Sequence, residues 1–174
     1  MKSYQKQDFL ATDADILIVD DKPENLRLLS SILSEQGYKV RRVINGNLAL
    51  NAAQLEPPDL ILLDISMPEI NGYEVCKELK LKPETQEIPV IFLSAKDDVF
   101  DKVLAFEVGG SDYITKPFYV QEVMLRVKNQ LILHQQQKQL IAEIRARYEA
   151  ESALQKAKLE IIRLTKKLEN KHLQ

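Results

Sequence analysis

The sequence predicts an α/β fold in which five parallel strands form one sheet with helices on both faces. Short apolar runs alternate along the chain with helical patterns, and this alternation is typical of βαβ units. One run, residues 60–63, holds four consecutive aliphatic residues between Asp59 and Asp64, which predicts a strand buried on both faces in the middle of the sheet. The chain has 174 residues, 45% of them apolar, enough for one such domain and an appendage.

The first half of the chain supplies three strands and two helices. The predicted strands are residues 16–19, 38–43 and 60–64, and the predicted helices are residues 22–36 and 46–55. Pro23 begins the first helix and Gly37 ends it, because proline suits the first helical position and glycine the position after the last. Residues 38–43 alternate as an outer strand does. The inward side of the second helix is expected to hold Leu48, Ala49, Ala52 and Ala53.

The second half supplies two strands and three helices. The predicted strands are residues 89–93 and 113–114, and the predicted helices are residues 72–81, 98–108 and 119 to about 171. A loop containing Pro68 and Asn71-Gly72 separates the 60–64 strand from its helix, and Gly109-Gly110 ends the next helix. Right-handed crossovers between parallel strands then place helices on both faces of the sheet.

Composition and charge exclude several classes of protein. Lys and Arg number 15 against 21 Asp and Glu in residues 1–133, and 9 against 5 in residues 134–174. An acidic domain with a mildly basic tail argues against a dedicated nucleic-acid binder. Cys76 is the single cysteine, so a disulfide framework and a thiolate metal cluster are excluded. With neither a signal peptide nor a span-length apolar run, the sequence predicts a cytoplasmic protein without a membrane partner.

Acidic and hydroxyl side chains follow three of the predicted strands, at the point where each strand ends. They are Asp20-Asp21, Asp64 and Ser94, and Lys116 follows the fifth strand. The carboxyl ends of parallel strands open onto one edge of the sheet, which is where such sheets bind ligands. A lone Asp64 would be read as a loop cap, but this convergence favours a functional site.

The predicted site has the groups that phosphoryl transfer needs. Three neighbouring carboxylates repel one another, and Mg²⁺, which prefers a few carboxylates with water, would compensate them. Asp64 would be the nucleophile and form an aspartyl phosphate. Lys116 and the metal would stabilise charge on the transferring oxygens, and Ser94 would donate a hydrogen bond to one of them.

These residues carry a family resemblance. Residues 14–133 resemble the receiver domain of two-component response regulators, a flavodoxin-like fold. The resemblance rests on four motifs in order: Val19-Asp20-Asp21; Asp64 with Met67-Pro68-Glu69-Ile70-Asn71-Gly72; Ser94-Ala95; and Asp112-Tyr113-Ile114-Thr115-Lys116-Pro117-Phe118. It implies a phosphoprotein that takes its phosphoryl group from a histidine kinase or a histidine phosphotransfer protein onto Asp64.

The resemblance also implies roles for individual residues. Asp21 and Asp64 would bind Mg²⁺ directly, Asp20 would act through water, and Ser66 would offer its backbone carbonyl. The backbone of Ala95 would contact the phosphoryl group. The Lys116-Pro117 peptide would be cis, and Ser94 and Tyr113 would form the pair of residues that switch on phosphorylation.

The tail predicts a long helix without Gly or Pro after Tyr119. Its apolar residues recur at spacings of three and four, with a slip near Glu151, which predicts a coiled coil. The expected partner is a second copy in a parallel homodimer through residues 140–168; the bland alternative is a linker. His134 could be imagined as a phosphorylated histidine but lacks the residues expected after one.

Three function classes remain open: a phospho-accepting switch, a phosphatase with an aspartate nucleophile, and a scaffold with a vestigial site. The switch is favoured, because the phosphatase needs a second acid where Ser66 stands, and because every expected site residue is present. The protein is then no enzyme beyond its own phosphorylation and dephosphorylation. The predicted domains are a flexible segment (1–13), the receiver (14–133) and a coiled-coil tail (134–174); alternatively the chain is the receiver part of a longer sensor kinase or cyclase, with the tail as linker.

Overall fold

The computed structural model describes residues 13–95 and 99–172, and the side chains of residues 13–95 and 103–167. Except for residue 13, the predicted flexible segment at residues 1–13 lies outside the described residues. So does the side chain of Leu168, the last apolar residue of the predicted dimer segment 140–168. The chain consists of two units, Met1–His134 and Gln135–Gln174.

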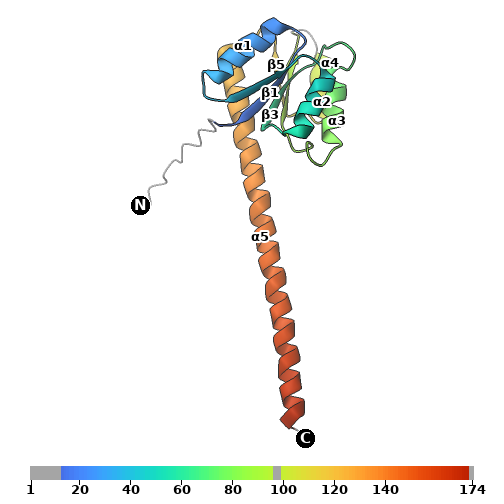
Figure 1. Cartoon of the computed structure of the whole chain (residues 1–174), viewed down its shortest axis with the longest axis vertical. Coiled ribbons are helices and arrows are strands. Elements are labelled where there is room, and N and C mark those ends of the chain that lie inside the picture. Colours follow the sequence, from blue (N-terminus) through green and yellow to red (C-terminus); the bar gives the residue numbers. More distant parts are fainter. Residues whose placement is uncertain (1–12, 96–98, 173–174) are drawn as a thin grey trace, which may run out of the picture. The chain divides into compact units, whose positions relative to one another are not determined.

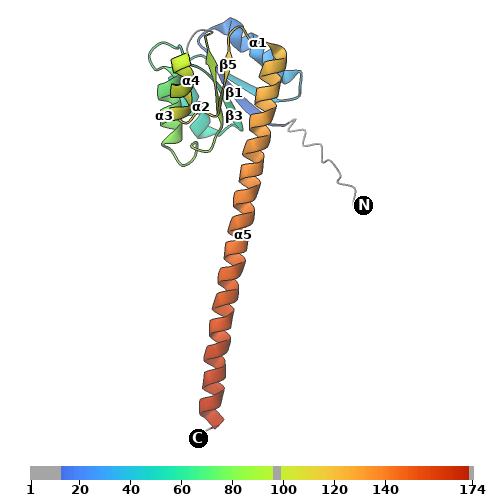
Figure 2. The same ribbon diagram turned by 180° about the vertical axis from the view of Figure 1, so that it is seen from behind.

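The first unit is built on one five-stranded parallel sheet with the order β2-β1-β3-β4-β5 (Figure 1, Figure 2). The strands are β1 (Asp15–Val19), β2 (Lys39–Val43), β3 (Leu60–Asp64), β4 (Val90–Ser94) and β5 (Asp112–Thr115). The helices are α1 (Pro23–Ser34), α2 (Gly46–Leu55), α3 (Gly72–Lys80), α4 (Val99–Glu107) and α5 (Val120–His172). The predicted fold class is confirmed.

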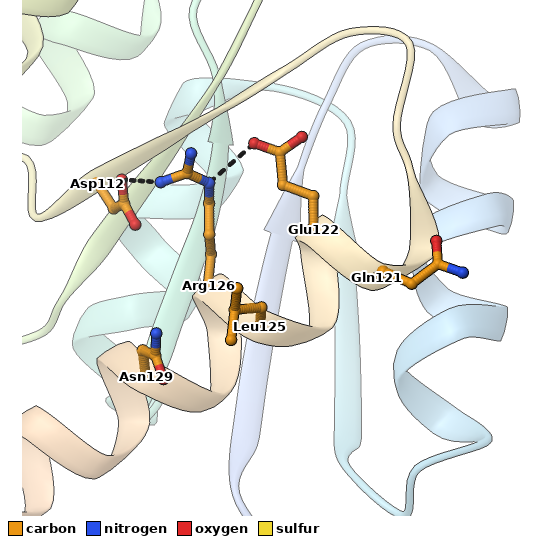
Figure 3. A pocket seen from close by; sticks show the side chains of 6 residues that line it. All are labelled: Asp112, Gln121, Glu122, Leu125, Arg126 and Asn129. Atoms are coloured by element: carbon orange, nitrogen blue, oxygen red, sulfur yellow. Dashed lines mark hydrogen bonds and ion pairs between the residues drawn. The ribbon is translucent and has the colours of Figure 1, made fainter.

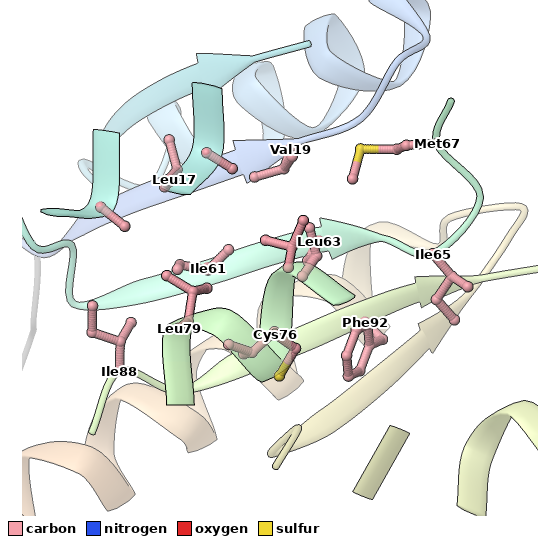
Figure 4. Packing of buried hydrophobic residues seen from close by; sticks show 14 of the residues in the cluster. Leu17, Val19, Ile61, Leu63, Ile65, Met67, Cys76, Leu79, Ile88 and Phe92 are labelled. Carbon is pink, nitrogen blue, oxygen red and sulfur yellow. The ribbon is translucent and has the colours of Figure 1, made fainter. Parts of the chain in front are cut away.

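Successive residues of the central strands enter two different cores, because side chains alternate across a sheet. Ile61 and Leu63 of β3 pack with Cys76 and Leu79 of α3 (Figure 4). The same cluster includes α2 and the buried Ala105 of α4. Leu60 and Leu62 pack on the other face with α1 and the first turns of α5. All five residues of β3 are buried, so this strand is covered on both faces, as its aliphatic run predicts.

One prediction about α2 is wrong. Leu48 was expected to point inward, but its side chain is 45% exposed. Asn45 caps the helix by accepting a hydrogen bond from the Leu48 backbone N–H, and the buried positions are then Gly46, Ala49 and Ala53. Leu48 precedes Ala49 by one residue, so the helical rotation of about 100° per residue turns it away from the core.

The loop after β3 holds α3 close to the end of the strand. A Cβ atom at Gly72 would overlap the carbonyl oxygen of Asp64, so only glycine allows the helix to begin there. Asn71 and Glu74 close this start as a capping box. The loop therefore fixes the backbone that carries Asp64.

The second unit is the part of α5 after His134. Every described side chain there is exposed except those of Gln135 and Ser152, which are half-exposed. Several short-range ion pairs follow the helix surface, among them Arg145 with Glu149 and Arg147 with Glu151. Among the described residues, α5 and the other helices lack any stretch long and apolar enough for a membrane span.

Candidate functional site

The site lies where four strands of the sheet end. Asp20 directly follows β1, Asp64 is the last residue of β3, Ser94 is the last of β4, and Lys116 directly follows β5. The parallel register pairs Asp64 with Leu93 and Ser94 with Thr115, so these ends lie side by side. The expected convergence at one edge of the sheet is observed.

Three carboxylates gather at this edge. Asp20, Asp21 and Asp64 each offer an oxygen within 4.8 Å of the others. Asp20 is fully buried and Asp64 is 3% exposed. Two unit charges 4 Å apart repel by about 4 kcal/mol at an effective dielectric constant of about 20. The cluster therefore needs cationic compensation.

Lys116 supplies one positive charge and shares it between two acids. Its Nζ donates to Asp64 Oδ1 at 2.8 Å and to Asp20 Oδ2 at 2.9 Å. The Lys116-Pro117 peptide bond is cis, and the Lys116 backbone N–H donates to the Ser94 carbonyl at 2.8 Å. Burial lowers the pKa of the Lys116 ammonium, but its hydrogen bonds to Asp64 and Asp20 outweigh burial and raise it overall. Lys116 therefore stays charged.

The Asp64 carboxyl responds in a different way. Burial raises the pKa of Asp64, and the neighbouring charges of Asp20 and Asp21 add to this rise. The hydrogen bond and charge of Lys116 lower the pKa, but they do not reverse the shift. One lysine shared with Asp20 is too little for three carboxylates, so ionised Asp64 is held in an unfavourable setting.

Three buried oxygen atoms in the site lack a hydrogen-bond partner among the described residues. They are Asp21 Oδ1, Asp64 Oδ2 and Ser94 Oγ. Buried polar atoms are nearly always satisfied, so such orphans call for a ligand or ion. Carboxylate oxygens from Asp21 and Asp64 are the donors that a hard divalent cation prefers. The residues present therefore fit Mg²⁺.

Asp20 differs from its neighbour because its oxygens are already occupied. Asp20 Oδ1 accepts from the Lys22 backbone N–H at 2.8 Å, and Oδ2 accepts from Asn25 Nδ2 at 2.8 Å as well as from Lys116. Sequence reasoning missed Asn25. Its place in the first turn of the helix after Asp20-Asp21 was the available signal, since that turn faces the strand end.

The remaining predicted residues lie around this centre. Ser66 lies in the loop after β3 and Ala95 directly follows β4, and both are exposed. Tyr113 lies in β5, with its ring edge-on to Phe106 at 6.4 Å between centroids. The Arg126 guanidinium lies 5.3 Å from the centroid of the Tyr113 ring.

Arg126 also lines a pocket on α5 and β5. Its Nη1 donates to Asp112 Oδ1 at 2.8 Å and its Nε to Glu122 Oε1 at 2.9 Å (Figure 3). The pocket is lined by Asp112, Gln121, Glu122, Leu125, Arg126 and Asn129. Arg126 therefore pairs with both carboxylates of this pocket while its guanidinium lies beside the Tyr113 ring.

Comparison with known families matches residues 16–128 to the response regulator receiver domain. The chain belongs to this family. The receiver is therefore that of a two-component system, as the sequence motifs indicate. A curated relative is the alkaline phosphatase synthesis transcriptional regulatory protein PhoP of Bacillus subtilis (strain 168), 46% identical over 113 residues. That match covers 65% of this chain and 46% of the relative, so the chain spans about half the relative's length.

Solved receiver structures show the same fold. A response regulator from Chloroflexus aurantiacus J-10-fl is 38% identical with a TM-score of 0.67, covering 69% of this chain and 98% of that one. The signal receiver domain of a signal transduction histidine kinase from Syntrophus aciditrophicus is 42% identical with a TM-score of 0.64, covering 68% of this chain and 89% of that one. Both matches leave about a third of this chain uncovered.

Proposed function

We propose that this receiver takes a phosphoryl group onto Asp64 from the phosphohistidine of a histidine kinase or a histidine phosphotransfer protein, with Mg²⁺, and that the modification changes its protein contacts. One observation carries the proposal. Asp64 Oδ1 is held by Lys116 at 2.8 Å, while the buried Asp64 Oδ2 lacks a partner in the described part of the chain. The carboxylate is thus anchored by one oxygen and presents the other.

The transfer forms one bond and breaks one. An oxygen of Asp64 attacks phosphorus as the phosphorus–nitrogen bond of the donor breaks, and the electron pair leaves with the imidazole. Lys116, already beside Asp64, stabilises charge on the phosphoryl oxygens. When bound at Asp21 and Asp64, with the Ser66 carbonyl, Mg²⁺ would neutralise the same charge. The Ala95 backbone N–H and Ser94 would donate to the remaining oxygens.

Phosphoryl uptake tests this assignment. Incubation with Mg²⁺ and a small phosphodonor such as acetyl phosphate should add one acid-stable, base-labile group of about 80 Da. Asp64→Asn should abolish it, because an amide is not a nucleophile towards phosphorus. Asp59→Asn, which changes an acid at the other end of the same strand, is the matched control and should label normally. Label that persists in Asp64→Asn, on His134 for example, would refute the assignment.

The metal site makes a second, separable claim. Asp21 has an unpartnered oxygen, whereas Asp20 already accepts three hydrogen bonds. Asp21→Asn should therefore weaken Mg²⁺ binding more than Asp20→Asn does, since only Asp21 is proposed to touch the ion directly. Isothermal titration with MgCl₂ measures both, and equal affinities in wild type and Asp21→Asn would rule out this site.

The proposed signal passes through Ser94 and Tyr113. Ser94 Oγ is buried and unpartnered among the described residues, so a phosphoryl oxygen on Asp64 would give it an acceptor. Movement of Ser94 towards that oxygen vacates space next to β5, and the Tyr113 ring would turn inward. This couples the chemistry to the surface of α4, β5 and α5.

We also propose that the protein is no enzyme towards other substrates. A phosphatase built on an aspartate nucleophile needs a general acid two residues later, and Ser66 stands there. A hydroxyl cannot replace a carboxylic acid in this role at neutral pH. Stoichiometric rather than multiple turnover with acetyl phosphate or p-nitrophenyl phosphate is the expected result, and sustained turnover would contradict it.

A parallel homodimer through residues 140–168 is the proposed output. Five apolar side chains, at intervals of four, six, seven and three residues, are at least half exposed on this helix: Ile144, Tyr148, Leu154, Ile161 and Leu164. Burying each one stabilises the pair by roughly 1.5–3 kcal/mol before entropy is subtracted. Parallel pairing keeps the two receivers at the same end, where phosphorylation of one can alter its contact with the other.

Light scattering on the full chain tests the dimer. Wild type at tens of micromolar should have twice the monomer mass of 20.0 kDa, and Leu154→Glu with Ile161→Glu should have the monomer mass. Lys156→Gln with Arg163→Gln changes the net charge by the same two units at exposed positions two residues after Leu154 and Ile161, which do not share their helix face, and should stay dimeric. A monomeric wild type, or a double Leu154 and Ile161 variant of unchanged mass, would leave the tail as a linker.

A second candidate is a receiver at the front of a longer signalling protein. It is supported by the Syntrophus aciditrophicus structure, a receiver domain of a histidine kinase, and by the coverage of less than half of PhoP. The tail would then connect the receiver to an output domain. The mass of the native protein, measured on cell extract with an antibody to the receiver, distinguishes this from a chain that ends at residue 174.

A further inference from the structure

The hydrogen bonds around Asp20 suggest a role for Asn25. Asp20 is fully buried, and its Oδ2 accepts from two donors, Asn25 Nδ2 at 2.8 Å and Lys116 Nζ at 2.9 Å. The Lys22 backbone N–H occupies Oδ1 at 2.8 Å. A carboxylate with this burial needs such donors, because an unpaired buried charge is costly. Asn25 thus supplies one of the three donors to Asp20.

This contact is not ordinary helix capping. A capping asparagine accepts a hydrogen bond from a backbone N–H of the first turn, but Asn25 already lies inside α1, two residues after Pro23. The cap position is Lys22, which makes no side-chain capping bond. A carboxylate can only accept, so the Asn25 amide must turn its NH₂ group towards Asp20. Its side chain therefore serves the acidic site rather than the helix.

The consequence concerns Lys116, which Asp20 and Asp64 share. To follow a phosphoryl group on Asp64, the ammonium must give up its bond to Asp20 Oδ2. The Asn25 amide stays on that same oxygen, so Asp20 is not left with a bare buried charge. Asn25 is also neutral, so it satisfies Asp20 without competing as a cation for Asp64.

We propose that Asn25 is a positioning residue that holds Asp20 so that Lys116 can leave it for the phosphoryl group. This inference rests on the proposed phosphorylation of Asp64. Without the amide, Asp20 retains Lys116 more strongly and also attracts a bound Mg²⁺ or its water more strongly. Loss of Asn25 should then slow phosphoryl transfer while metal affinity holds or rises. A residue that merely supports the fold would weaken both together.

The test uses the full chain with Asn25→Leu, which keeps the side-chain size and removes the donor. Its phosphorylation rate constant at saturating Mg²⁺ should fall about 3- to 10-fold, the range of one hydrogen bond of ordinary strength. Its Kd for Mg²⁺, by isothermal titration, should stay equal or decrease. The matched control is Asn51→Leu on the exposed side of α2, which should change neither quantity.

A measurement without metal tests the contact itself. In EDTA, Asn25→Leu should lower the urea midpoint relative to Asn51→Leu, and this difference should disappear in an Asp20→Ala background, where the acceptor is gone. An equal effect in both backgrounds would refute the contact. A rate constant within twofold of wild type, or a parallel loss of rate and Mg²⁺ affinity, would overturn the role in releasing Lys116.

Absence of phosphorylation at Asp64 and absence of a role for Asn25 give different results in these experiments. If wild type itself takes up no phosphoryl group, the proposed function falls and the role of Asn25 falls with it. If wild type is phosphorylated normally and Asn25→Leu behaves like Asn51→Leu, only the role of Asn25 falls.

Discussion

The receiver unit and the tail helix both pair basic with acidic side chains, but they do so in opposite surroundings. The Lys116 side chain is 22% exposed and bonds two acids whose side chains are 0% and 4% exposed. Arg145 and Glu149 in the tail are 81% and 67% exposed. In water an ion pair of the second kind contributes little, whereas removing water makes each charge of the first kind costly and reactive.

The same contrast holds for apolar side chains. Ile61, Leu62 and Leu63 of β3 are fully buried, whereas Ile144, Leu154 and Ile161 of the tail are more than half exposed. The apolar side chains of the receiver thus pack against one another within one chain. The apolar stripe of the tail has no packing partner among the described residues. The lesson is that similar residue types build a reactive site in one region and a surface for association in the other.

The largest expected effect comes from comparing a buried leucine of the receiver with an exposed leucine of the tail. Leu62→Ala should destabilise the receiver by about 2–5 kcal/mol, because it removes a fully buried side chain and leaves a cavity. Leu154→Ala is the matched control and should change receiver stability by less than about 0.5 kcal/mol. Urea unfolding followed by tyrosine fluorescence measures both. Similar losses would mean that the tail is part of the receiver's cooperative unit.

A smaller effect, of opposite sign, is expected at Asp64. Because its pKa is raised in the folded state, the native protein holds this proton more tightly than the unfolded chain does. Stability should therefore fall as pH rises from the unfolded pKa, near 4, through the folded value, and then level off. Asp64→Asn lacks this fall, so in EDTA it should be more stable than wild type at pH 7.

The free energy of unfolding of Asp64→Asn and wild type, measured over a series of pH values, tests this expectation. The stability difference between Asp64→Asn and wild type should vanish below the unfolded pKa of the carboxyl, where both side chains are neutral. Adding MgCl₂ at pH 7 should stabilise wild type by mass action and leave Asp64→Asn much less affected. A variant that is less stable than wild type at pH 7 in EDTA would contradict the strained carboxylate.

The sequence could predict much of this fold because the strands are strongly marked. Four consecutive aliphatic residues in β3 and in β1 leave few alternatives, and the parallel ends of such strands must share an edge. Asp64, Ser94 and Lys116 could be brought together on that ground alone. The fifth strand was harder: β5 runs from Asp112 to Thr115, longer than the two residues its apolar content indicates.

What the sequence could not predict depends on atomic direction. The apolar character of Leu48 predicts a core residue, but the rotation of α2, set by the Asn45 cap, turns its side chain outward. The contact between Asn25 and Asp20 needs the first turn of α1 to face the strand end, and composition does not show which side chain of a turn points there. The same holds for the unpartnered oxygens of Asp21 and Asp64, because hydrogen-bond satisfaction is a property of coordinates.

The smallest expected effects compare one arginine from each region. Arg126 is 31% exposed and bonds both Asp112 and Glu122 beside the Tyr113 ring. Arg126→Met keeps the apolar stem and removes the fork of donors, so Asp112, 18% exposed, loses a charged partner. The expected loss is about 1–2 kcal/mol. Arg145→Met removes a fully solvated pair, and the expected change is at most about 0.5 kcal/mol.

Two further measurements sharpen this last comparison. Arg126→Lys keeps the charge but not the planar two-sided geometry, so it should recover only part of the loss seen in Arg126→Met. Raising NaCl from 0.1 to 1 M should remove any contribution of Arg145 to the free energy of unfolding, because exposed ion pairs are screened by salt. The contribution of Arg126 should largely remain. Urea titrations could instead show that Arg126→Met and Arg145→Met lose the same free energy of unfolding and respond equally to salt. Partial burial would then not explain the difference between the ion pairs of the receiver and those of the tail. The contrast between the two regions would then rest on the Lys116 site and on the apolar side chains alone.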